Sequence, residues 1–89
     1  MKWALEYSDS AKKYLRTLSK TDRERIESTV EKLRDGPYNR RDLNIKQLKG
    51  RDGWRLRVGK WRILYAIYNA EILISVIKIG ARGDVYKDN

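Results

Sequence analysis

Arginine residues gather in the second half of the sequence, in a pattern that could hold phosphate groups. Arg55 and Arg57 lie two positions apart in one strand-like run, and Arg62 follows just after the next turn. Guanidinium groups bind phosphate oxygens through planar, paired N–H donors, and they stay charged at neutral pH. Such a set could bind a phosphodiester and stabilise the negative charge that develops on it during cleavage.

A two-residue turn at residues 59–60 would bring these arginines together. With that turn, Arg57 lies directly opposite Arg62, and Arg55 lies opposite Leu64. Directly opposed residues share a face of a sheet, so the three arginines are expected on one face. Like charges in direct opposition destabilise a sheet, and neither strand contains an acidic residue to offset them. Such a local conflict is typical of a site that receives an anion.

The segment after the last expected strand is predicted to return to the same site. A second two-residue turn at residues 69–70 would bring the end of that strand next to the arginines, with Lys78 beside Trp61. Glycines in the segment that follows allow sharp bends of the backbone. We therefore expect Arg82 and Tyr86 to swing over the arginine cluster.

The balance of charges points to a polyanionic partner. The 89 residues, 10.6 kDa, fit one domain spanning residues 1–89. Lys and Arg number 21 against 12 Asp and Glu, so the formal net charge is +9. That charge favours nucleic acid, a ribosome, an anionic membrane surface or an acidic protein. The chain has no membrane-length apolar run and no signal-peptide pattern, so we expect a soluble, cytoplasmic domain without a membrane partner.

The residue types that are missing exclude several kinds of catalytic site. The sequence has no Cys, hence no thiol nucleophile and no Cys-ligated zinc, and no His, the usual general base. The acidic residues are dispersed, so we predict no metal site and no cofactor. RNA cleavage remains open, because the ribose 2′-OH is an internal nucleophile beside the scissile phosphate. The protein needs only to orient it and to stabilise charge.

The spacing of apolar residues predicts an α+β fold in the order β-α-α-β-β-β, with one further short strand before the last three. Residues 2–7 alternate as a strand, and residues 11–18 follow at helical spacing. A second helix is expected from an N-cap at Thr21, with Glu24 completing a capping box, to a stop at Gly36. Further strands are expected around residues 46–49 and at residues 54–58, 61–68 and 71–79, giving an antiparallel sheet with a helical hairpin packed on one face. The strand residues expected to face the core are Trp54, Leu56, Val58, Trp61, Ile63, Tyr65 and Ile67.

Four segments, in this order and spacing, carry a resemblance to a known family. They are residues 48–50 (LKG), 54–58 (WRLRV), 61–65 (WRILY) and 79–86 (IGARGDVY). With the order of elements, they resemble the RelE family of bacterial and archaeal toxins over nearly the whole chain. The resemblance implies a RelE-like fold and a toxin of a type II toxin–antitoxin system that enters the ribosomal A site and cleaves mRNA there. It also implies a cognate antitoxin as partner, and contact with operator DNA only through the antitoxin complex.

The same resemblance assigns roles to individual residues. The family's functional basic pair maps to Arg55 and Arg57, and its phosphate-binding arginine to Arg62. Its C-terminal arginine, assigned to leaving-group protonation, maps to Arg82, and its terminal tyrosine to Tyr86. The basic pair is often lysine in well-known members, and the arginines here are poor general bases, since arginine keeps its proton above about pH 12. The predicted catalytic residues are Arg57, Arg62, Arg82 and Tyr86, and the predicted substrate-binding residues are Arg55, Lys49 and Lys60.

Two other functions remain open for this sequence. ParE-type toxins share the RelE fold but act on DNA gyrase, and they generally lack the full set of nuclease residues. A non-catalytic basic module that binds RNA or the ribosome would also account for the charge. The presence of all five matching positions favours a metal-independent, ribosome-dependent endoribonuclease that inhibits translation.

Overall fold

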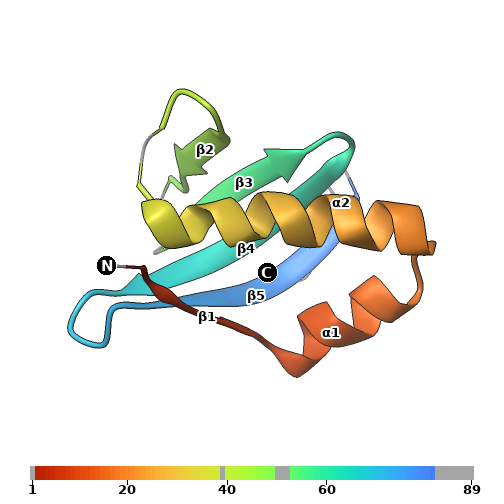
Figure 1. Cartoon of the computed structure of the whole chain (residues 1–89), viewed down its shortest axis with the longest axis horizontal. Helices are drawn as coiled ribbons and strands as arrows, with labels where there is room; N and C mark the ends of the chain where they lie inside the picture. Colours follow the sequence, from red (N-terminus) through yellow and green to blue (C-terminus); the bar gives the residue numbers. More distant parts are fainter. Residues whose placement is uncertain (1, 39, 50–52, 82–89) are drawn as a thin grey trace.

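The computed structural model describes residues 2–38, 40–49 and 53–81. Their strands form one five-stranded sheet in the order β1-β5-β4-β3-β2 (Figure 1). The elements are β1 (Ala4–Tyr7), α1 (Asp9–Arg16), α2 (Lys20–Glu31), the 3₁₀ helix η1 (Lys32–Asp35), β2 (Asn44–Gln47), β3 (Trp54–Val58), β4 (Trp61–Tyr68) and β5 (Leu73–Ala81). The predicted α+β class and the predicted order of elements are confirmed.

One pairing in the sheet differs from the expected antiparallel arrangement. The first strand, β1, runs parallel to β5, with Ala4 opposite Leu73 and Tyr7 opposite Val76, so the sheet is mixed. The sequence did not indicate this direction, because both helices and three strands separate the two partners and no tight turn links them. The other neighbouring strands pair antiparallel, as predicted.

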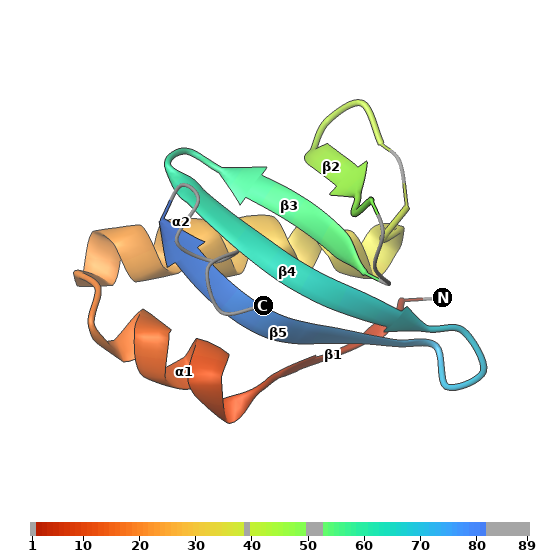
Figure 2. The same ribbon diagram turned by 180° about the vertical axis from the view of Figure 1, so that it is seen from behind.

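The two faces of the sheet have different surroundings. Helix α2 crosses one face, and α1 lies along the edge beside β5 (Figure 1). Figure 2 shows the opposite face, with β3, β4 and β5 in front of α2. None of the helices among the described residues is long and apolar enough to cross a membrane. The core between helices and sheet contains Ala11, Leu15, Ile26, Val30, Leu33, Leu56, Trp61, Ile63, Tyr65, Ile74 and Val76.

The alternation predicted for β3 and β4 is confirmed, and it separates a buried face from a basic one. Leu56, Ile63 and Tyr65 are fully buried, and Trp61 is 4% exposed. Trp54 packs against this core from its margin. Both tryptophans are therefore core residues of the sheet rather than exposed stacking platforms.

Serine residues begin both helices. The Ser8 hydroxyl accepts a hydrogen bond from the Ala11 amide at 3.1 Å and so caps α1. For α2 the predicted N-cap at Thr21 is wrong, because the hydroxyl of Ser19 accepts from the Asp22 amide at 3.2 Å. Ser19 stands three residues before Asp22, and Thr21 stands at the same spacing before Glu24. The carboxylate of Asp22 in the first turn favours the earlier start.

Substitution of Ser19 tests in solution whether this residue caps the start of α2. We expect Ser19→Ala to lower the free energy of unfolding by about 1 kcal/mol, because one amide of the first turn loses its acceptor. Thr21→Ala is the matched control and should have little effect, since Thr21 is an exposed position inside α2. Urea denaturation of both variants measures the difference. A larger loss for Thr21→Ala would place the cap where the sequence pattern first indicated.

The hairpin between β3 and β4 has the predicted register. Val58 lies opposite Trp61 across a two-residue turn, and each pair further along follows as expected. Gly59 has a φ of +57°, in the left-handed region that favours glycine. A Cβ at this position would also lie 3.2 Å from the Arg25 guanidinium, which reaches the turn from α2.

The connection between β4 and β5 differs from the predicted two-residue turn. Tyr68 pairs with Leu73, so the loop contains four residues, 69–72, and β5 spans Leu73–Ala81 instead of residues 71–79. The Ile72 amide donates to the Asn69 carbonyl at 3.2 Å, and the Ile72 carbonyl accepts from Ala4 of β1 at 2.8 Å. Contacts with the distant β1 therefore help to set the length of this loop.

A bulge in β5 shifts the faces of its last residues. Tyr65 pairs with Val76 but Leu64 pairs with Lys78, which leaves Ile77 as the extra residue. The expected position of Lys78 beside Trp61 is therefore wrong. After the bulge, Lys78 shares the face of Leu64, and the next residue in the chain points into the core.

The short strand β2 begins two residues earlier than the predicted strand at 46–49. It spans Asn44–Gln47, with Ile45 opposite Leu56. Ile45 packs against the core, and this apolar contact fixes the register. The shift places Lys46 opposite Arg55 on the other face of the sheet.

Candidate nucleic-acid interface

Every Lys and Arg in strands β2 to β5 falls on the sheet face away from the core. Cross-strand partners share a face, and the pairs form two neighbouring rows. These four strands contain no Asp or Glu. We call this surface the basic face, and its residues are Lys46, Arg55, Arg57, Arg62 and Lys78.

The first row contains three of the five cations. Lys46 of β2 lies opposite Arg55 of β3, which lies opposite Leu64 of β4, and Leu64 lies opposite Lys78 of β5. Leu64 is 6% exposed. Two positive charges on one side of this apolar residue and one on the other therefore lie along a line across the sheet.

The second row contains the opposed arginines. Asn44 lies opposite Arg57, Arg57 opposite Arg62, and Arg62 opposite Gly80. The direct opposition of Arg57 and Arg62, predicted from the hairpin, is confirmed. Arg57 is exposed and Arg62 is half-buried, so a ligand can reach both from solvent. Two guanidinium groups placed in this way can bind the oxygens of one phosphate.

Neutral groups are the hydrogen-bond partners of these arginines. Arg55 Nη2 donates to Asn44 Oδ1 at 3.1 Å, and Arg57 Nε donates to the Gly59 carbonyl at 3.3 Å. Within the described part of the chain, no carboxylate forms an ion pair with Arg55, Arg57 or Arg62. Their positive charge therefore remains available to an anion.

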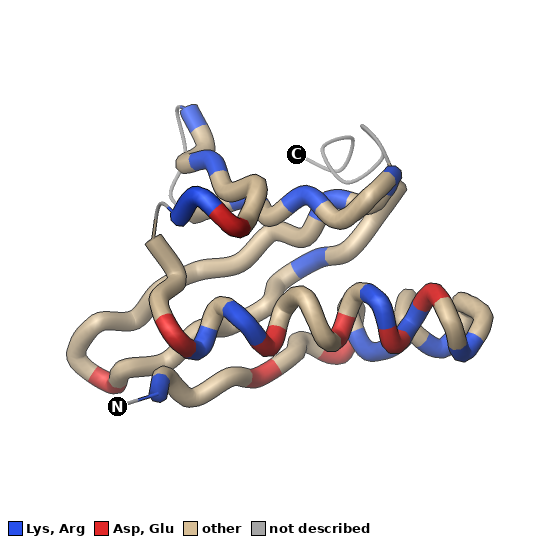
Figure 3. Tube along the Cα trace, turned by 45° about the horizontal axis from the view of Figure 1, so that its top comes forward, with Lys and Arg blue, Asp and Glu red and all other residues tan. Residues whose placement is uncertain are grey.

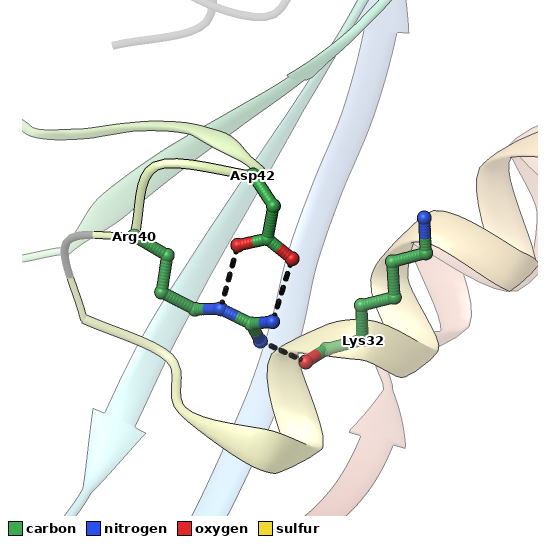
Figure 4. Close-up of polar contacts among 3 residues, drawn as sticks. All are labelled: Lys32, Arg40 and Asp42. Carbon is green, nitrogen blue, oxygen red and sulfur yellow. Dashed lines mark hydrogen bonds and ion pairs between the residues drawn. The ribbon is translucent and has the colours of Figure 1, made fainter.

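Arginine residues elsewhere in the fold have a structural role instead. Arg40 donates from Nε and Nη2 to the two carboxylate oxygens of Asp42, at 3.0 and 2.7 Å (Figure 4). Its Nη1 also donates to the Lys32 carbonyl, so the loop after η1 is tied to the end of the helical segment. Along α2, acidic and basic residues alternate (Figure 3). The basic face differs from both regions because it lacks acidic neighbours in its strands.

The predicted substrate-binding lysines lie at two different edges of the basic face. Lys60 belongs to the turn next to Arg57 and Arg62, and its Nζ lies 5.2 Å from the centre of the Trp61 ring. Lys49 lines a hollow of about 220 Å³ beside the first row. Lys60 therefore lies in the turn next to the opposed arginines in the chain, with its Nζ at the core residue Trp61, and Lys49 lies beside the neighbouring row.

The predicted catalytic residues Arg82 and Tyr86 lie outside the described residues. The last described residue, Ala81, is opposite Trp61, one position beyond the pair formed by Arg62 and Gly80. The end of β5 is thus next to the opposed arginines, as expected from the sequence, although the register that leads there is not the predicted one.

Tyrosine residues of the core are not candidates for proton transfer at the basic face. Tyr65 lies on the opposite face of the sheet, and its hydroxyl donates to the Pro37 carbonyl at 2.7 Å. Burial raises the pKa of Tyr65 above its ordinary value. Burial, and then the nearby charges of Glu27 and Glu31, raise the pKa of Tyr7 in the same direction. Both hydroxyls therefore stay protonated in ordinary conditions.

Comparison with known proteins identifies relatives of this chain. Residues 5–86 match the family model described as the ParE toxin of the type II toxin–antitoxin system parDE. The chain is also 30% identical over 89 residues to RelE1 of Methanocaldococcus jannaschii, which is named as a toxin, and the match covers 99% of each chain. The chain belongs to the RelE/ParE family of type II toxins. The resemblance stated from the sequence is confirmed.

Solved structures of RelE proteins have the same fold. RelE in the RelE–RelB complex of Pyrococcus horikoshii superposes with a TM-score of 0.81 at 24% identity, covering 94% of this toxin and 99% of that chain. A mutant of Escherichia coli RelE in the free state gives 0.74 at 23% identity, with coverage of 97% and 92%. The RelB–RelE complex of Methanococcus jannaschii gives 0.72 at 23% identity, with coverage of 92% and 95%.

The sequence did not place three cations of this toxin where the three-dimensional structure has them. Lys46 reaches the basic face through the corrected register of β2, and Lys78 reaches it through the bulge. Arg25 approaches the Gly59 turn from α2. A sequence signal existed for Lys46 alone, since Ile45 beside it marks the buried face of the strand.

Proposed function

We propose that this toxin is a ribosome-dependent endoribonuclease that cleaves mRNA and so inhibits translation. The observation that carries the proposal is the direct opposition of Arg57 and Arg62, with no acidic residue in β2 to β5. Opposed like charges destabilise a sheet unless an anion binds between them. The phosphodiester of RNA is an anion of suitable size, and guanidinium groups bind it with paired donors.

The proposed reaction uses the nucleophile that RNA itself supplies. The ribose 2′-oxygen attacks the adjacent phosphorus and loses its proton, and the bond from phosphorus to the 5′-oxygen breaks. The products are a cyclic 2′,3′-phosphate and a 5′-hydroxyl, which takes up a proton. Arg57 and Arg62 would hold the non-bridging oxygens, where negative charge increases in the transition state. We propose that Arg82 assists the leaving oxygen and that Tyr86 orients the nucleotide.

Lysine and arginine residues around this pair would hold the rest of the substrate. Lys60 is in the turn next to the opposed arginines, Arg55 is in the neighbouring row, and Lys49 lines the hollow beside that row. Because arginine is a poor general base, we propose that the ribosome contributes by arranging the mRNA for in-line attack. This requirement would restrict cleavage to translated mRNA in the cytoplasm, without a metal or cofactor.

We further propose that a cognate antitoxin neutralises this toxin. The related RelE chains of Pyrococcus horikoshii and Methanococcus jannaschii were solved as complexes with RelB. A formal charge of +9 on a toxin of one domain, residues 1–89, favours an antitoxin with acidic segments. Operator DNA would then be contacted only through the toxin–antitoxin complex.

Mapping of mRNA ends after induced expression tests the enzymatic function. We expect growth arrest together with new 5′ ends inside translated codons, seen by primer extension. An untranslated copy of the same message, lacking its ribosome-binding site, is the control and should stay intact. Growth arrest without such ends would contradict the proposal.

The match to the ParE family model supports a second candidate, inhibition of DNA gyrase. This function predicts induction of the DNA damage response with intact mRNA, and loss of supercoiling activity when purified toxin is added to gyrase. A non-catalytic basic module would instead bind RNA or ribosomes and give neither cleavage nor DNA damage. The same induction experiment therefore separates the three functions.

A further inference from the structure

We propose that the hollow beside β2 is a second phosphate-binding site, which holds the RNA backbone next to the cleaved bond. Its three cations are Lys46, Lys49 and Arg55, and Lys46 has no role in the reaction proposed above. The site itself follows from its own geometry, and only the assignment of RNA as its ligand rests on the proposed function.

The hollow concentrates positive charge in a small volume. It measures about 220 Å³ and is lined by Lys46, Gln47, Leu48, Lys49 and Arg55. Among the described residues that line it, three are cations and none is acidic, and they come from β2, β3 and the chain after β2. A tetrahedral anion fits a site of this size and charge.

The guanidinium of Arg55 has an unsatisfied donor at this site. Its Nη2 is occupied by Asn44, but its Nε is buried and has no hydrogen-bond acceptor among the described residues. A buried N–H group without an acceptor is unfavourable, and such groups are uncommon in folded proteins. An anion bound in the hollow would favour a rotation of the Arg55 side chain that brings this N–H to an oxygen acceptor.

The distance to the opposed arginines suits consecutive phosphates of one RNA strand. Arg55 and Arg57 lie two residues apart on the same face of β3. Two residues of a strand span about 7 Å, which is of the order of the spacing between neighbouring phosphates in an extended single strand. One phosphate at Arg57 and Arg62 would therefore place the next within reach of Arg55 and Lys46.

The adjoining surface leaves room for the nucleoside attached to that phosphate. A second hollow, of about 380 Å³, shares Gln47 with the first, and its other lining residues are Gly53, Trp54, Ala66, Ile67 and Tyr68. Tyr68 is 47% exposed on the outer face of β4. An aromatic ring beside a cationic groove is a common feature of sites for single-stranded nucleic acid. This continuity favours RNA over a free anion.

Binding of an oligonucleotide that cannot be cleaved tests the second site. The probe is a 2′-O-methyl hexanucleotide with a fluorescent label, added to the full-length toxin, with anisotropy as the readout. We expect the double variant Lys46→Ala/Lys49→Ala to weaken binding about tenfold and to reduce the salt dependence by roughly one phosphate contact. The double variant Lys12→Ala/Lys20→Ala is the matched control, because it removes the same charge from exposed helix positions.

The length of the probe separates the second site from general charge. With a 2′-O-methyl dinucleotide, which has one phosphodiester, the two double variants should bind alike. Equal weakening by both double variants with the hexanucleotide would overturn the site. Equal loss of binding to an oligoglutamate peptide would also overturn it, because it would indicate a surface for acidic proteins. Urea denaturation of each variant checks that the fold is retained.

The binding test of the second site can succeed or fail independently of the test for mRNA cleavage. If mRNA remains uncut in cells but the Lys46→Ala/Lys49→Ala variant loses hexanucleotide binding, the second site stands and the nuclease function fails. If mRNA is cut and the variant binds as the native toxin does, the nuclease function stands and the second site fails. The binding assay needs no ribosome, so the two results come from separate measurements.

Discussion

Replacing Arg62 with glutamine is expected to abolish mRNA cleavage and, at the same time, to make the folded toxin more stable. The Arg62 side chain lies directly opposite Arg57, and β2 to β5 have no acidic residue that offsets the repulsion. Opposed like charges destabilise a sheet by a few tenths of a kcal/mol to about 1 kcal/mol. Loss of one group that stabilises transition-state charge lowers a catalytic rate by about 100- to 1,000-fold.

Arg40 provides a matched control for this substitution. Its guanidinium forms a two-point ion pair with Asp42 and donates to the Lys32 carbonyl (Figure 4). Arg40→Gln should therefore lower the free energy of unfolding and leave cleavage unchanged. Urea denaturation and single-turnover cleavage on programmed ribosomes measure the two properties for both variants. An Arg62→Gln toxin that is less stable and fully active would show that this pair has a structural role.

Opposite effects on stability and activity would locate the site more firmly than loss of activity alone. A residue that is needed for folding loses both properties when it is replaced. When a residue binds substrate but destabilises the fold, its replacement gives a more stable and less active protein, as is common for residues of functional sites. The opposed arginines of β3 and β4 belong to the second kind if the proposed function is right.

The sequence predicted the part of the sheet that local rules control. The β3–β4 register followed from a two-residue turn with glycine in its first position and an unbroken alternation of apolar residues on both sides. A slip by one residue would have moved Leu56 and Ile63 out of the core, so the pattern permitted one register. This register places Arg55, Arg57 and Arg62 on one face of the sheet.

The parts that the sequence did not predict depend on contacts between distant segments. The loop at residues 69–72 is held by the backbone of β1, and the bulge at Ile77 lies where α1 meets β5, with the Ser8 hydroxyl donating to the Ile77 carbonyl at 2.6 Å. No local spacing indicates either contact. The start of α2 was ambiguous for a different reason, because Ser19 and Thr21 both precede an acidic residue by three positions.

Substitutions in the C-terminal segment of the candidate site are expected to have a large effect on the rate of mRNA cleavage. We expect Arg82→Ala to lower the single-turnover rate of mRNA cleavage on the ribosome by about 100-fold or more, because it removes the group proposed to assist the leaving oxygen. Tyr86→Phe should lower the rate less, since the ring that orients the nucleotide remains. Binding of the uncleavable hexanucleotide should change little in either variant, because the role proposed for Arg82 concerns the transition state and Tyr86→Phe keeps the ring.

These effects are expected because β5 ends next to the opposed arginines. Gly80 lies opposite Arg62 and Ala81 opposite Trp61, so β5 ends one register position beyond the opposed arginines. Lys87→Ala is the matched control, because it removes a positive charge from the same segment at a position with no proposed role. Equal rates for Arg82→Ala and Lys87→Ala would mean that the segment contributes charge alone. The opposed arginines would then have to cleave RNA with the ribosome as their only assistant.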